Sequence, residues 1–225
     1  MPKVARIAPV VAGVAGLAAF WAELAPQRAG FPDTDHPGQG LEFIAAQPGA
    51  WAVVGVAFMA FAVALVVTVL SVRARLLAAS PTGQESVSVD ALTVIGLFGA
   101  LMAFGFGIMR MGAGPIQYIQ GLDQSWGEAA YLVTQIAGVQ LLEPGSFLAL
   151  ILWIVGVAWL GARRGVVPRV VAVLAVLPAF RLLGFLGPFG LALEELWIFS
   201  IVAIPAAYVW LALLGAWPGV SRNAA

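Results

Sequence analysis

Residues 50–72 read AWAVVGVAFMAFAVALVVTVLSV, a run that contains no charged side chain. An α-helix needs about 20 mostly apolar residues to cross the roughly 30 Å hydrocarbon core of a bilayer, so this stretch predicts a transmembrane helix. Further stretches meet or approach the same test at residues 4–24, 91–112, 146–161, 166–186 and 191–217. We therefore expect an all-α fold, a polytopic transmembrane helical bundle of six spans, with residues 1–225 forming a single integral membrane domain.

The composition agrees with a bilayer environment and excludes several kinds of function. The chain is 62% hydrophobic and 10% charged, against roughly 45–50% and about 25% in a soluble domain. It has no cysteine and one histidine, His36, which excludes thiolate and multi-histidine metal sites within one chain. Eleven basic residues balance eleven acidic ones, so there is no basic excess for nucleic acid. We expect the lipid bilayer as surroundings and no cofactor, metal or nucleic-acid partner.

The basic residues predict how the chain crosses the membrane. Lys and Arg in short loops stay on the cytoplasmic side. Eight of the eleven basic residues fall on the side that holds the N-terminus, namely Lys3, Arg6, Arg73, Arg75, Arg163, Arg164, Arg169 and Arg222. Both termini are therefore predicted to be cytoplasmic in a multi-pass cell-membrane protein. A cleaved signal peptide is disfavoured, because the first apolar run is longer than a signal core and no good cleavage site precedes Pro26.

Residues 127–142, GEAAYLVTQIAGVQLL, are the main ambiguity. They are almost long enough for a seventh span, but a seventh span would place the arginines at 163, 164 and 169 outside, against the charge rule. Their polar residues Glu128, Tyr131 and Gln135 share one side of a helix. We expect a short outer helix, either amphipathic or re-entrant.

Tryptophan residues fall near the predicted span boundaries, where their rings prefer the headgroup level. The outer boundary has Trp21, Trp51, Trp126 and Trp197, and the inner boundary has Trp159 and Trp217. We interpret them as interfacial anchors and not as a cofactor-binding stack.

Ionisable residues inside spans are costly and are candidates for a functional site. Arg181 precedes a predicted turn near Pro188, and counting about 1.5 Å per residue on both sides places it level with Glu194 and Glu195. An ion pair between Arg181 and one of these glutamates is the first candidate site.

Other charges lie at a similar predicted depth. Glu23, Arg110 and Glu143 end or begin their spans on the outer side. We hypothesise an outer polar cluster of these three residues with Arg181, Glu194 and Glu195, joined by Gln135, Gln140 or His36. The alternative is a set of interfacial charges that reach water, plus one pair that locks two helices.

Enzyme motifs are not complete. The sequence LEELWIFS at residues 193–200 has the adjacent glutamates of intramembrane CAAX-type proteases, but residue 199 is Phe where that motif has Arg. His36 lies in a loop, so no Ser-His pair is expected at membrane depth. We expect a non-enzymatic protein that binds or passes a small molecule or lipid, or that serves as a membrane partner. The alternative is an intramembrane enzyme that uses the Glu and Arg cluster for acid-base chemistry.

Four short features give the chain a family resemblance. They are the start KVARIAPVVAGVAGLAAF, the loop end FIAAQPGAW, the arginine of FGFGIMR, and the turn RRGVVPRVVAVL. In their order the chain resembles uncharacterised bacterial six-helix membrane proteins of the DUF4386-like type, a domain of unknown function. The resemblance implies six helices in a bacterial inner or plasma membrane, and it implies no catalytic residue.

Overall fold

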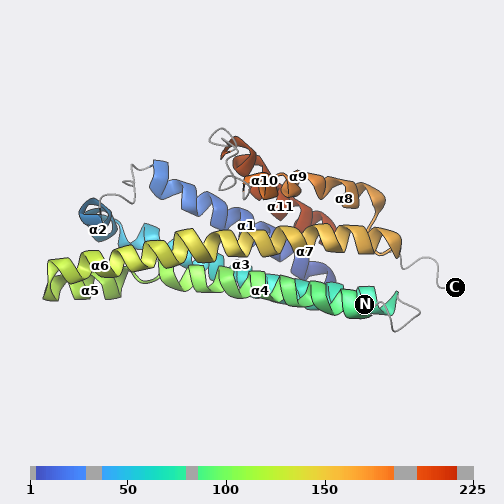
Figure 1. Ribbon diagram of the computed structural model, residues 1–225, viewed down its shortest axis with the longest axis horizontal. Helices are drawn as coiled ribbons and strands as arrows, with labels where there is room; N and C mark the ends of the chain where they lie inside the picture. The colour runs from blue at the N-terminus through green and yellow to red at the C-terminus, as the bar shows by residue number, and fades with distance from the viewer. Residues whose placement is uncertain (1–3, 29–36, 80–85, 185–196, 217–225) are drawn as a thin grey trace.

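A computed structural model describes residues 4–28, 37–79, 86–184 and 197–216, and every regular element in these ranges is a helix (Figure 1). The elements are α1 (Val4–Arg28), α2 (Pro37–Ala46), α3 (Pro48–Ala78), α4 (Ser86–Arg110), α5 (Ala113–Leu122), α6 (Gln124–Gln135), the π-helix η2 (Ile136–Leu142), α7 (Glu143–Arg163), α8 (Arg169–Leu174), α9 (Val176–Ala179), α10 (Arg181–Gly184) and α11 (Trp197–Ala216).

The long helices pack side by side in a closed order. α11 packs on α1, α1 on α3, α3 on α4 and α4 on α7, while α8 and α9 lie against both α7 and α11. Large aromatic side chains fill the interior, with the Trp153 and Trp210 rings 6.4 Å apart in an edge-to-face arrangement. The Trp210 indole also donates a 2.7 Å hydrogen bond to the Val171 carbonyl of α8. This bond holds α8 against α11.

Four helices of the described chain are long and apolar enough to cross a membrane: Arg6–Leu24, Pro48–Ala78, Ser86–Arg110 and Gln124–Arg163. Their outward faces carry exposed valine, leucine and phenylalanine, such as Val63, Val94 and Leu101. Because such surfaces are stable only in an apolar environment, a lipid setting follows for this part of the chain. The first three helices correspond to the first three predicted spans.

The predicted boundary between the outer helix 127–142 and the span 146–161 is wrong. The structure has one continuous helix of 40 residues from Gln124 to Arg163. At about 1.5 Å per residue it is about 60 Å long, twice the thickness of a hydrocarbon core. Residues 127–142 are therefore neither a separate span nor a separate helix, and α6 continues α7 away from the bundle (Figure 1).

Glu143 and Pro144 resemble a helix start, which is why the break was predicted there. A proline inside an α-helix lacks a donor and clashes with the carbonyl four residues back. Here the preceding turn is the π-helix η2, in which the Glu143 amide donates to Gly138, five residues back. The wider turn accommodates Pro144 without ending the helix.

The predicted fifth span, 166–186, is divided into α8, α9 and α10. Pro178 would clash with the Leu174 carbonyl in a regular helix. Helix α8 ends at Leu174, and the Ala175 amide donates to the Ala172 carbonyl, three residues back. The sixth predicted span, 191–217, corresponds to α11, and its residues 191–196 and 217 lie outside the described residues.

Two glycines let α3 and α4 approach closely. A Cβ atom on Gly55 would lie 2.6 Å from the Gly107 carbonyl oxygen, and one on Gly107 would lie 2.7 Å from the Gly55 oxygen. Such contact between small residues drives helix association where lipid supplies no hydrophobic force.

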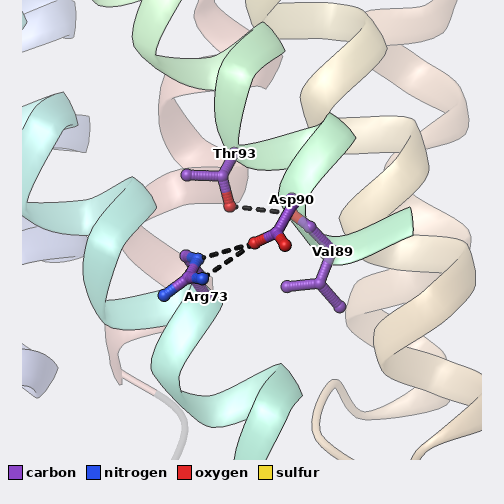
Figure 2. Close-up of polar contacts among 4 residues, drawn as sticks. All are labelled: Arg73, Val89, Asp90 and Thr93. Carbon is purple, nitrogen blue, oxygen red and sulfur yellow. Dashed lines mark hydrogen bonds and ion pairs between the residues drawn. The ribbon is translucent and has the colours of Figure 1, made fainter. Parts of the chain in front are cut away.

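The C-terminal ends of α3 and α7, which carry arginines, lie at the same end of the bundle as the N-terminal end of α4. Figure 2 shows Arg73 of α3 donating to the Asp90 carboxylate of α4, with Nη2 to Oδ1 at 2.8 Å. Arg164 donates a 2.8 Å hydrogen bond to the Leu76 carbonyl at the end of α3. We call this the basic end, defined by Arg73, Arg75, Arg163, Arg164 and Arg169.

The opposite end has a helical cap formed by α2, α5 and α6. Leu41, Ile44, Trp51, Ile116 and Tyr131 form its small apolar core. The Asp123 carboxylate begins α6 by accepting hydrogen bonds from the Ser125 and Trp126 amides, at 2.8 and 3.3 Å. The cap covers the region where the outer polar cluster was predicted.

Candidate polar site beneath the helical cap

The centre of the site is an ion pair between α1 and α4. The Arg110 Nη2 atom donates to the Glu23 Oε1 atom at 2.7 Å. Both side chains are largely buried, with 10% of Arg110 and 14% of Glu23 exposed. Taking two charges out of water is costly, so the attraction must be supported by further contacts.

Two aromatic rings supply part of that support. The Arg110 guanidinium carbon lies 4.3 Å from the Trp51 ring centroid and 4.8 Å from the Phe106 centroid. A desolvated cation over an aromatic face is stabilised by about 2 kcal/mol. Trp51 is only 2% exposed, so its predicted role as an interfacial anchor is wrong, whereas Trp21, Trp126 and Trp159 are exposed.

A second acid interacts electrostatically with this pair, and a second arginine interacts electrostatically with that acid. The charge of Glu143, the first residue of α7, interacts with those of Glu23, Arg110 and Arg181. Arg181 begins α10, which packs against α7. The π-helix η2 directly precedes Glu143, and its wider turn sets the face of α7 on which this carboxylate lies. We call Glu23, Arg110, Glu143 and Arg181 the polar cluster.

A buried tyrosine from α11 reaches the same region. Tyr208 is 0% exposed and is electrostatically coupled to both Glu23 and Glu143. Its ring packs edge-on against Phe61, with the centroids 5.1 Å apart, and Gly16 of α1 leaves room for it. Within the described residues its hydroxyl has no hydrogen-bond partner.

A second buried tyrosine lies in the apolar core of the cap. Tyr131 of α6 is 0% exposed and is electrostatically coupled to Arg110. Its hydroxyl also lacks a hydrogen-bond partner in the part of the chain that the structure describes, and Gly40 of α2 packs closely on its ring. Tyr131 and Tyr208 thus each have a buried hydroxyl without a hydrogen-bond partner among the described residues.

The predicted site residues divide into two groups. The structure pairs Glu23 with Arg110, and Glu143 interacts electrostatically with both of them and with Arg181. Glu194, Glu195 and His36 lie outside the described residues, so the expected pair between Arg181 and one of these glutamates is not described. Of the two candidate glutamines, Gln135 is buried and Gln140 is exposed.

Sequence reasoning missed Trp51, Tyr131 and Tyr208 as members of the site. The sequence could have indicated Tyr208, because it is the one tyrosine in the predicted sixth span. A buried tyrosine usually needs a hydrogen-bond partner. The sequence indicates Tyr131 only as one of the polar residues on one side of a predicted helix.

One carboxylate of the cap, that of Asp123, has a shifted pKa. Hydrogen bonds from the Ser125 hydroxyl, then from the Trp126 and Ser125 amides, lower the pKa of Asp123 below its ordinary value. The carboxylate therefore stays ionised at neutral pH and favours the start of α6.

The described residues contain no group of three or more His, Asp or Glu side chains placed to hold a metal ion. No family model, curated protein or solved structure matches the chain. The case for function therefore rests on the polar cluster itself.

Proposed function

We propose that this chain is a multi-pass protein of the bacterial cell membrane that binds a small polar molecule or a lipid headgroup at the polar cluster, without chemistry of its own. Six spans and cytoplasmic termini complete the proposal, supported by the apolar helices and by the gathering of arginines at the basic end. The cluster lies at the opposite end and so faces the outer leaflet.

The observation that carries the proposal is the pair of buried, unbonded hydroxyls on Tyr131 and Tyr208. A buried polar group without a partner costs about 1–3 kcal/mol. A ligand that hydrogen-bonds both hydroxyls recovers this free energy on binding, which gives it affinity and orientation.

The charges favour a ligand without large net charge. Among the described residues the cluster has two carboxylates and two guanidinium groups, so their formal charges cancel. An added unbalanced charge would have to be buried without a partner, which is strongly unfavourable. A neutral polyol or a zwitterionic headgroup fits this requirement.

The test is to identify what co-purifies with the chain. Protein extracted in a mild detergent is examined by native mass spectrometry, and bound small molecules and lipids are identified after release. The Glu143→Gln variant removes one charge of the cluster with little change in size. Glu42→Gln is its matched control, because Glu42 is exposed on α2.

We expect a bound species in the unmodified chain and in Glu42→Gln that is lost or strongly reduced in Glu143→Gln. An equal amount of every co-purifying species in all three proteins would contradict the proposal. Recovery of a chemically altered form of an added ligand would favour the alternative, an intramembrane enzyme using the same carboxylates.

A further inference from the structure

A groove at the opposite end of the bundle is independent of the polar cluster. It has a volume of about 380 Å³ and lies between the second half of α7 and the segment α8–α9. Its walls are mostly small, with Ala158 and Ala162 on one side and Ala172, Ala175 and Ala179 on the other. These side chains are too short to fill the space between the helices.

The mouth of the groove opens to the apolar surroundings. Val155, Trp159, Val173 and Val176 line it and are 38–69% exposed. From Val155 to Arg163 the α7 wall rises about 12 Å, the extent of part of one acyl chain. An apolar groove open along a lipid-facing surface is shaped for such a chain.

A cationic group closes the groove at the basic end. Arg163 lines it, and its guanidinium carbon lies 4.6 Å from the Trp159 ring centroid. Arg169 follows across the short turn to α8, and both arginines are exposed. Neither arginine takes part in an ion pair in the described chain, where the pairs are Arg73 with Asp90 and Arg110 with Glu23.

We propose that this groove is a binding site for an anionic phospholipid, with an acyl chain between α7 and α8–α9 and the phosphate beside Arg163 and Arg169. Charge complementarity favours this occupant over a zwitterionic lipid or a second copy of the chain. Basic pockets between membrane helices bind anionic headgroups, and anionic lipids are enriched in the cytoplasmic leaflet, where the charge rule places this end.

Trp159 provides a reporter within the groove. The chain is reconstituted in two kinds of phosphatidylcholine vesicle. One contains a minor amount of phosphatidylglycerol with brominated acyl chains, and the other contains the same amount of phosphatidylcholine with brominated acyl chains. Bromine quenches the fluorescence of nearby tryptophan residues. The Trp159→Phe variant gives the fluorescence of the other tryptophans, which is subtracted to obtain that of Trp159. The preference is the ratio of quenching by the two brominated lipids.

We expect brominated phosphatidylglycerol to quench Trp159 more strongly than brominated phosphatidylcholine. Arg163→Gln and Arg169→Gln should each lower this preference about fivefold, because a basic residue near an anionic surface contributes about 1 kcal/mol. Arg6→Gln is the matched control, since it removes an exposed arginine of α1 that does not line the groove. It should keep the preference.

Two results would overturn the proposal. One is equal quenching by both brominated lipids in the unmodified chain. The other is a dimer in detergent that Ala172→Phe dissociates, which would show that a second copy fills the groove. Retention of the species bound at the polar cluster in Arg163→Gln separates this test from that of the proposed function.

Discussion

Arg110 on α4 hydrogen-bonds Glu23 on α1 at 2.7 Å, although the two residues are 87 positions apart in the chain. Both helices pack on α3, so the pair bridges across the end of that helix. It links α1 to α4 within the polar cluster.

Breaking the pair from one side should be more harmful than removing both charges. Arg110→Met leaves the Glu23 carboxylate buried without its partner, and such a change costs about 3–5 kcal/mol. The double variant Glu23→Gln with Arg110→Met should lose less free energy of unfolding than the two single variants lose in sum. Denaturant unfolding in detergent measures the four proteins, and strict additivity would contradict a direct interaction.

The contact between α3 and α4 should depend on the absence of a side chain at Gly107. Gly107→Ala places a Cβ 2.7 Å from the Gly55 oxygen, and overpacking of this kind costs about 1–3 kcal/mol. Gly114→Ala on α5 meets nothing within 4 Å and should not lower the melting temperature. Equal melting temperatures for the two variants would show that the helices are not in close contact there.

The topology predicts opposite exposure for the cap and the basic end. The chain has no cysteine, so single cysteines can be introduced without further changes. Tyr118→Cys, at an exposed position on α5, should react with a membrane-impermeant maleimide in intact cells. Arg169→Cys should react only after the cells are permeabilised, and the reverse pattern would invert the proposed orientation.

The start of α6 should become less stable in acid. Because hydrogen bonds lower the pKa of Asp123 in the folded protein, its stabilising effect is present above the unfolded pKa and is lost as the pH falls through the folded one. Asp123→Ala should therefore speed amide exchange at Ser125 and Trp126 at neutral pH. The difference from the unmodified chain should shrink in strong acid, and a difference that grew in acid would contradict this account.

Hydrophobic patterning predicted α1, α3 and α4, because residues in lipid must be apolar over a fixed length. Counting residues from the span ends also predicts a similar depth for Glu23, Arg110, Glu143 and Arg181, and the structure pairs the first two of them. Depth along parallel helices depends only on rise per residue, which the sequence supplies.

The continuous helix from Gln124 to Arg163 was not predictable in the same way. Glu143 and Pro144 match a helix start locally, and only the π-helix η2 keeps the helix intact across them. Likewise, whether Trp51 anchors at an interface or lies beneath Arg110 depends on how α3 is rotated about its axis. That rotation is set by packing between distant helices such as α3 and α4, including the approach of Gly55 to Gly107.

The most direct test of ligand binding at the polar cluster is a high-resolution cryo-electron microscopy map of the full chain in lipid nanodiscs. The account predicts non-protein density within hydrogen-bond distance of the Tyr208 and Tyr131 hydroxyls, beside Glu143. It predicts loss of that density in a Tyr208→Phe, Tyr131→Phe double variant, but not in Tyr118→Phe, whose hydroxyl is on the exposed face of α5. A map in which both hydroxyls bond to protein groups and no density lies between them would contradict it.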